Sequence, residues 1–233
     1  EEKGLAWSGR VIDIVKKQEQ LEPWYLKLNP KGVIPMLEYR NGTTKALTDS
    51  ARIIRFIASL PEGNALLPQS ESDNQLLDKL INLADDIVLQ ILSYARHPSM
   101  EKSEKILDAR VEKSLLMSEK HPELKSNYEV CAARSEKSKT FRVDKKHIED
   151  IEQSTLEAIT FAENQLQGNN FLLGNAYTLA DVIWTVVLSR LDLLGYSTWL
   201  DKNNFPQIAS YYLRMQQRKS YTLAQIQNEW WEK

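Results

Sequence analysis

The feature that most constrains this fold is an apolar strand that begins with proline, in the segment Asn29-Pro30-Lys31-Gly32-Val33-Ile34-Pro35-Met36-Leu37. Proline cannot donate to a strand ladder, so it is confined to strand starts, edges and bulges. A cis Ile34-Pro35 peptide accounts for this placement, because the cis form costs little before proline and holds a backbone group in one orientation. The segment therefore predicts a strand that starts at Pro35 and a fixed main chain at Ile34.

A hairpin and a helix follow this strand start. Two strand-like runs, residues 36–39 and 44–48, flank Asn41-Gly42, which suits both centres of a type I′ turn. Asp49-Ser50 then precedes a helical stripe of apolar residues at positions 53, 54, 57 and 60. Asp49 and Ser50 are thus expected at a helix N-terminus, where free amides and the dipole favour a bound carboxylate. Plain N-capping is the alternative for these two residues.

The first residues predict an N-terminally incomplete domain. Glu1-Glu2-Lys3-Gly4 is typical of a helix end with glycine at C′, and residues 7–14 are typical of a strand. We therefore expect further residues upstream of Glu1.

The periodicity changes after Pro61, which indicates two domains. Residues 62–73 are rich in breakers and polar residues and are interpreted as a linker. Beyond them the pattern is helical almost throughout, beginning with an apolar-faced helix over Gln75–Tyr94 capped by Asp73 or Ser72. The predicted fold is α/β plus all-α, with domains at 1–61 and 74–233.

Two later segments have different interpretations. The charged run Arg134–Lys146 is interpreted as a solvated loop or helix end. In Tyr177-Thr178-Leu179-Ala180-Asp181, Thr178 and Asp181 have capping-box spacing, with Asp in place of the commoner Glu or Gln. We therefore predict a structural role for Asp181 at the start of a core helix.

Composition excludes several classes of function. Among 233 residues, 30 Lys and Arg nearly balance 32 Asp and Glu, so general nucleic-acid affinity is not expected. No apolar run is long enough to span a bilayer. The single cysteine, Cys131, cannot form an internal disulfide, and burial on a helix is its favoured interpretation. His97, His121 and His147 lack metal-ligand spacing, so no metal site is expected, and Trp230-Trp231 are expected to cover a core edge.

These motifs together resemble the glutathione transferase superfamily. The Pro35 turn followed by Asp49-Ser50 is similar to its glutathione site, and residues 177–181 are similar to the start of its sixth helix. Residues 119–128, 177–194, 205–212 and 214–220 most resemble tetrachlorohydroquinone dehalogenase-like bacterial transferases. The ganglioside-induced differentiation family shares a similar insertion, so insertion length does not settle the subfamily.

The resemblance implies a thioredoxin-like N-terminal domain, its first strand and helix upstream of this chain, and an all-helical C-terminal domain. It implies glutathione as cosubstrate, bound by Val33, Ile34, Pro35, Asp49 and Ser50, with Val33 standing where the family has a polar residue. The activating Ser, Tyr or Cys would lie upstream, so no catalytic residue is nominated. The expected enzyme is a cytoplasmic homodimer that acts on a small hydrophobic electrophile, by conjugation or reductive dehalogenation. A non-catalytic binding or assembly module on the same fold is the alternative.

Overall fold

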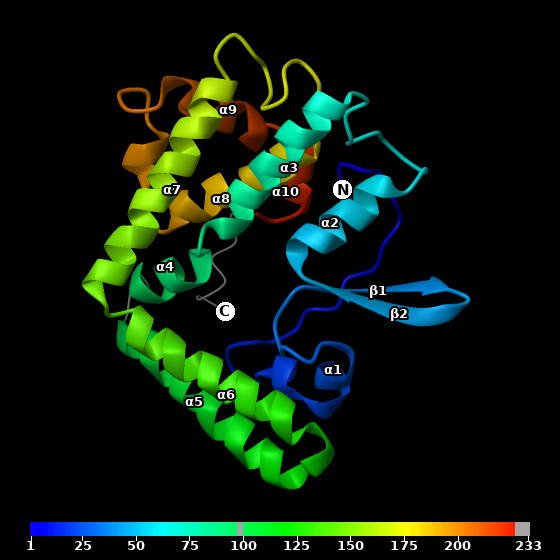
Figure 1. Ribbon diagram of the computed structural model, residues 1–233, viewed down its shortest axis with the longest axis vertical. Coiled ribbons are helices and arrows are strands. Elements are labelled where there is room, and N and C mark those ends of the chain that lie inside the picture. Colours follow the sequence, from blue (N-terminus) through cyan, green and yellow to red (C-terminus); the bar gives the residue numbers. More distant parts are fainter. Residues whose placement is uncertain (97–99, 227–233) are drawn as a thin grey trace. The chain divides into compact units, whose positions relative to one another are not determined.

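The computed structural model describes residues 1–96 and 100–226, which form two compact units (Figure 1). The first unit contains residues 1–6, 54–93 and those from 149 onward, and the second contains Trp7–Ile53 and Tyr94–Ile148. His97 and Trp230-Trp231 lie outside the described residues. The proposed division into 1–61, 62–73 and 74–233 stays a prediction.

The second unit contains the hairpin and a helical pair. Strand β1 (Met36–Asn41) pairs antiparallel with β2 (Thr43–Thr48), and this pair is the sheet of the described chain. The predicted hairpin is confirmed, but the predicted two-residue turn with Asn41-Gly42 at its centre is wrong. Asn41 pairs with Thr43, so Gly42 alone forms the apex, at φ +73°.

Helices of the second unit enclose a small core next to this hairpin. α5 (Met100–Lys120) and α6 (Lys125–Phe141) run side by side, joined by η2 (Pro122–Leu124) (Figure 1). The 3-10 turn η1 (Glu19–Leu21) leads into α1 (Pro23–Leu28). Their shared core consists of Leu21, Leu26, Leu124, Tyr128 and Cys131.

The first unit is helical and is organised around α8 (Leu179–Leu193). α8 packs against α3 (Glu71–Asp86), and the fully buried Trp184 donates its indole N–H to the carbonyl of Leu80 at 3.0 Å. The remaining elements within the described residues are α2 (Ser50–Ser59), α4 (Leu89–Arg96), α7 (Lys145–Gln165), η3 (Ser197–Leu200), α9 (Pro206–Gln216) and α10 (Lys219–Leu223).

The strand predicted over residues 7–14 is wrong, because that segment has no regular structure. The amide of Asp13 donates to the Glu19 carboxylate at 2.8 Å, and the Asp13 side chain accepts from Val15 and Lys16. Local side-chain acceptors thus take backbone donors that a strand would give to a neighbour. Residues 1–4, predicted as a helix end, form a turn, in which Gly4 has φ +71° and donates its N–H to the Glu1 carbonyl.

The continuous helix predicted over Gln75–Tyr94 is also wrong, because it is interrupted between α3 and α4. Ile87 is extended at φ −69° and ψ 110°, and the amide of Leu89 bonds the Ile87 carbonyl at 2.8 Å. Two successive β-branched residues, Ile87 and Val88, weaken the helix here, and the break buries the first while the second stays exposed. The N-cap is Ser70, whose side chain accepts from the amide of Asp73, and not Asp73 or Ser72.

The charged run Arg134–Lys146 was interpreted as a solvated loop or helix end, and it is largely helical, so the helix-end interpretation fits better than the loop. It forms the second half of α6 and the first residues of α7. Lys139 pairs with Asp108 at 2.6 Å and Arg142 with Glu104 at 3.0 Å. Opposite charges on α5 therefore match this run, which is why the charges support a helix pair.

Candidate functional site

The segment before Pro35 is shaped by two buried polar side chains of α1 and its C-cap. The Tyr25 hydroxyl donates to the carbonyl of Val33 at 2.6 Å, and the Asn29 amide nitrogen donates to the same carbonyl at 2.5 Å. Both side chains belong to buried residues, and burial raises the pKa of Tyr25, which keeps it protonated as a donor. The Val33 carbonyl is therefore fixed by two donors.

Fixing this carbonyl also fixes the amide of Ile34. A peptide unit is planar, and its N–H points opposite to its C=O. Ile34 is 48% exposed, and its main chain takes part in no hydrogen bond among the described residues. The predicted cis Ile34-Pro35 peptide is confirmed. The structure thus presents an unpaired, oriented main chain at Ile34, which is the requirement for adding an extended peptide to a strand edge.

Asp49 and Ser50 lie at the start of α2, as predicted. Asp49 has φ +83°, and its side chain accepts from the amide of Arg52 at 3.1 Å. The N-capping alternative is therefore realised. It uses one carboxylate oxygen, and the other takes part in no hydrogen bond among residues 1–96 and 100–226. The exposed carboxylate keeps a free acceptor beside the positive end of a helix dipole.

The hairpin brings these two parts of the site together. Met36 pairs with Thr48, so Pro35 and Asp49 each adjoin the same rung of the ladder. Paired residues in an antiparallel ladder have Cα atoms about 4.5 to 5.5 Å apart. The first amides of α2, beginning at Ser50, have no acceptors within the helix. One end of the hairpin therefore offers a main chain for a peptide, amides for an anion and a carboxylate for a cation.

The sequence reasoning placed Val33, Ile34, Pro35, Asp49 and Ser50 at this site, and the hairpin brings them to one end. It missed Tyr25 and Asn29. The signal for both was a helical spacing of four residues immediately before the proline segment, which places their side chains on one face.

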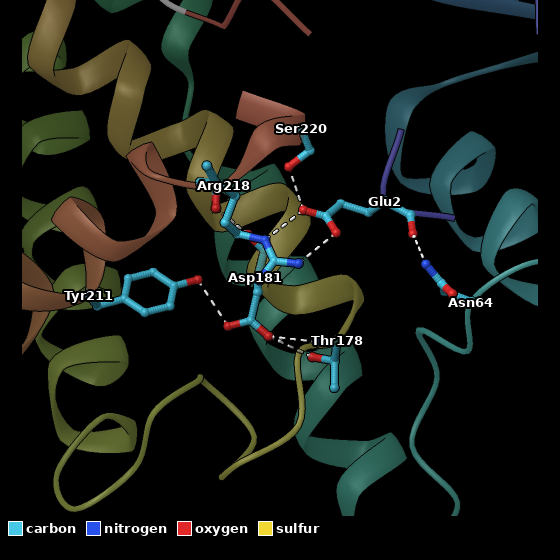
Figure 2. A network of polar contacts seen from close by, with 8 residues as sticks. Glu2, Asn64, Thr178, Asp181, Tyr211, Arg218 and Ser220 are labelled. Carbon is cyan, nitrogen blue, oxygen red and sulfur yellow. Dashed lines mark hydrogen bonds and ion pairs between the residues drawn. The ribbon is translucent and has the colours of Figure 1, made fainter. Parts of the chain in front are cut away.

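A second group of charged residues lies in the helical unit, around the start of α8 (Figure 2). The buried Asp181 accepts four hydrogen bonds: from the Thr178 amide at 2.8 Å, the Thr178 hydroxyl at 3.1 Å, the Leu172 amide at 3.1 Å and the Tyr211 hydroxyl at 2.9 Å. Burial raises the pKa of Asp181, and these hydrogen bonds oppose that rise. The predicted capping box is present, and Asp181 has no acceptor left for a ligand.

Glu2 and Arg218 form a second closed arrangement in the same view (Figure 2). Arg218 donates to both carboxylate oxygens of Glu2 at 2.7 Å, and Ser220 donates at 2.5 Å. Burial raises the pKa of Glu2, but these hydrogen bonds outweigh it and lower the pKa below its usual value. A hollow of about 470 Å³ adjoins them, and its lining contains this neutralised pair.

Residues 1–96 and 100–226 contain neither a metal-binding cluster nor a membrane-spanning helix. No group of three or more His, Cys, Asp or Glu side chains in this part of the chain could hold a metal ion. No helix there has both the length and the apolar character needed to cross a bilayer.

Two family models match the chain. The model for the glutathione S-transferase N-terminal domain matches residues 1–60, and that for the glutathione S-transferase C-terminal domain matches residues 145–214. The chain is 27% identical over 230 residues to a tetrachloro-p-hydroquinone reductive dehalogenase of Sphingobium chlorophenolicum, an alignment that covers 99% of this chain and 90% of the relative. A glutathione S-transferase of Arabidopsis thaliana is 23% identical, with 95% of this chain and 80% of the relative covered.

Solved structures share the fold at low sequence identity. A glutathione transferase of Burkholderia graminis, with two glutathione molecules bound per subunit, has a TM-score of 0.67 at 15% identity, covering 98% of this chain and 80% of that one. The β-etherase LigF of a Sphingobium strain has a TM-score of 0.66 at 18% identity, covering 97% and 91%.

Proposed function

Because this chain belongs to the glutathione S-transferase family, we propose that it binds glutathione and uses its thiol on a small hydrophobic electrophile. The family has the fold predicted from the sequence, a thioredoxin-like N-terminal part followed by a helical part. The observation that supports the proposal most directly is the open main chain of Ile34, oriented by the doubly bonded Val33 carbonyl.

Each part of glutathione has a matching group at the hairpin end. The cysteinyl unit would pair with the main chain of Ile34, next to Pro35, as an added strand. The γ-glutamyl carboxylate would meet the first amides of α2 at Ser50, and its ammonium would meet the free carboxylate oxygen of Asp49. Val33 contributes through its carbonyl, since its side chain is apolar.

The proposed reactions start from the same step. The glutathione sulfur forms a bond to an electrophilic carbon, and a leaving group such as halide departs with the electron pair. Conjugation ends there. In reductive dehalogenation, a second glutathione thiolate attacks the bound sulfur, glutathione disulfide forms, and the carbon takes a proton. We favour this substrate class because a relative is named a reductive dehalogenase.

Isothermal titration with reduced glutathione tests the site. Asp49→Asn keeps an oxygen for the Arg52 amide and tolerates positive φ, so it removes the charge and retains the cap. We expect it to weaken binding by about 1 to 3 kcal/mol, the range for a hydrogen bond to a charged group. Asp201→Asn is the matched control, because Asp201 caps amides of Asn203 and Asn204 in the other unit. Equal affinity in Asp49→Asn and Asp201→Asn would refute the site.

Turnover separates the two function classes. Consumption of glutathione in the presence of a halogenated quinol or chlorodinitrobenzene supports the enzyme. Glutathione binding without consumption of either electrophile would favour the binding or assembly module instead. The proposed compartment is the cytoplasm, where glutathione is abundant and the thiol of Cys131 stays reduced.

We also propose a two-fold homodimer, the commonest closed oligomer, with the segment Gln75–Tyr94, which covers most of α3 and α4, at the interface. The apolar face of α3 is used within its own unit, since Leu77, Leu80, Ile81 and Ala84 are buried there. The outward face is polar, so the interface would rest on hydrogen bonds and charges as well as apolar contact. Light scattering at micromolar concentration should give twice the chain mass, and a monomer mass would contradict the proposal.

A further inference from the structure

One face of α6 holds the loop that leads into the proposed glutathione site. Asn127 donates its side-chain amide to the Pro30 carbonyl at 3.3 Å. One turn further on, the Cys131 thiol donates to the Lys31 carbonyl at 3.5 Å. Arg134 donates to the Lys31 carbonyl at 2.6 Å and to the Gly32 carbonyl at 3.3 Å. These three residues are spaced four and three apart, so they form one stripe on the helix.

The close approach of α6 depends on a missing side chain in the loop. Gly32 has φ +57°, and a Cβ added there would lie 2.9 Å from the Cys131 sulfur. It would also lie 3.2 Å from the backbone oxygen of Gln20. The loop therefore fits between α6 and η1 because position 32 is glycine.

Together these donors hold three consecutive peptide units. Arg134 holds the carbonyls of Lys31 and Gly32, while Tyr25 and Asn29 hold the carbonyl of Val33. Each carbonyl fixes the plane of the peptide that follows it, and the last of these planes contains the amide of Ile34. Residues of α1 and its C-cap therefore fix this last peptide directly, and α6 fixes the two peptides before it.

We infer that Arg134, assisted by Asn127, is a positioning residue for glutathione recognition, an inference that rests on the function proposed above. Neither side chain needs to touch glutathione. An arginine suits this role because its planar guanidinium carries several donors in a fixed fork and can bond two carbonyls at once. A lysine at position 134 has one flexible ammonium and would hold the pair less firmly.

The inference predicts a specific kinetic pattern. Loss of Arg134 frees the loop before Pro35, so glutathione must order it on binding, and the affinity for glutathione falls. The inference assigns this loop to the recognition of glutathione alone, so the KM for the electrophile should change little. A residue that merely stabilised the fold would lower stability and leave the affinity of the folded protein unchanged.

The test compares Arg134→Ala, Arg134→Lys and Asn127→Ala with Lys125→Ala. Lys125→Ala is the matched control, because it removes a cation from the same helix, and the Lys125 ammonium lies 4.0 Å from the Glu129 carboxylate, a long ion pair. Calorimetry on folded protein should show Kd for glutathione raised about tenfold in Arg134→Ala, equivalent to about 1.4 kcal/mol. Arg134→Lys and Asn127→Ala should show smaller rises of about twofold to fivefold, and Lys125→Ala none.

The outcomes separate this inference from the proposed function. If the wild type does not bind glutathione, the proposed function fails and the inference fails with it. If the wild type binds and Asp49→Asn weakens binding, but all three variants match Lys125→Ala, the positioning role is overturned and the function stands. Should Arg134→Ala not fold, Arg134→Lys and Asn127→Ala decide the matter. Arg134→Lys keeps a cation at position 134, and Asn127→Ala removes a single hydrogen bond to the loop. A KM for the electrophile that rises as much as that for glutathione would also overturn the inference.

Discussion

Asp49 and Asp181 both lie at the cap or in the first turn of a helix. They differ in how many of their carboxylate acceptor sites lack a hydrogen-bond donor. Asp181 is fully buried and accepts four hydrogen bonds, from Leu172, Thr178 and Tyr211. Asp49 is exposed and accepts one from the amide of Arg52. The same residue type in similar positions therefore stabilises a core in one unit and leaves an acceptor open in the other.

A structural carboxylate and a binding carboxylate differ in how many of their acceptor sites the protein itself fills. A buried acceptor must be matched by donors, because each unmatched donor or acceptor costs about 1 to 3 kcal/mol. An exposed carboxylate at a cap gives up only part of its hydrogen-bonding capacity. The free part, next to the unpaired main chain of Ile34, is what a ligand can use.

We expect the greatest loss of stability when the fully hydrogen-bonded carboxylate of Asp181 is removed. Asp181→Ala leaves buried donors on Leu172, Thr178 and Tyr211 without an acceptor, so we expect a loss of about 3 to 5 kcal/mol in the free energy of unfolding. Asp49→Ala should cost about 1 kcal/mol, the typical value for an N-cap. Urea titrations of both variants measure the difference. Equal losses would show that the two carboxylates do not differ as described.

A second prediction concerns the loop at Gly32, which leads into the proposed glutathione site beside Asp49. Gly32→Ala forces a non-glycine residue to φ +57°, at about 1 to 2 kcal/mol, and overlap with Cys131 and Gln20 adds about 1 to 3 kcal/mol. Gly42→Ala has the same problem at φ +73°, but nothing lies within 4 Å of its added Cβ. Glutathione affinity should fall in Gly32→Ala and stay normal in Gly42→Ala. Equal affinity in the two variants would argue against the loop contacts.

The Glu2–Arg218 pair gives an intermediate effect that depends on pH. The pKa of Glu2 is lowered in the folded chain, so its contribution to stability is complete above the ordinary carboxyl pKa and is lost as the pH falls through the lowered one. Glu2→Gln should cost about 1 to 3 kcal/mol at pH 7. The stability gap to wild type should shrink below roughly pH 4.

Glu101→Gln serves as the control for this pH dependence. Glu101 pairs with Lys105 on the surface of α5, where both side chains are exposed, so its removal should leave stability nearly unchanged. Urea unfolding at several pH values measures both variants. A gap for Glu2→Gln that stays constant into acid would contradict the linkage.

Local sequence signals predicted the parts of the molecule that local contacts determine. The Pro35 strand start, the hairpin, the helix after Asp49 and the capping box at Thr178 and Asp181 each depend on residues within a few positions. Their physical causes are a missing amide donor, a glycine at the hairpin apex and helix capping. These causes act over short distances along the chain, so the sequence shows them directly.

Contacts between distant segments could not be read in the same way. Arg134 bonds a carbonyl 103 residues away, and nothing in the charged run around it marks that partner. The run therefore resembled a solvated loop or helix end, although charges on α5 match it. The break at Ile87 likewise follows from burial of one β-branched residue beside an exposed one. The apolar periodicity continues across this position, so it predicted one uninterrupted helix.

We expect the smallest effect at Cys131, whose thiol is buried on α6. Cys131 is 1% exposed, and burial raises the pKa of its thiol despite the nearby Arg134, so little thiolate forms near neutral pH. The thiolate is the nucleophile in cysteine chemistry. Cys131→Ser, whose hydroxyl can donate to the Lys31 carbonyl in place of the thiol, should therefore retain most of the rate of glutathione consumption. The wild type should also resist alkylation by iodoacetamide until it unfolds. Abolished turnover in Cys131→Ser, with normal urea stability, would instead place the reactive sulfur chemistry in α6.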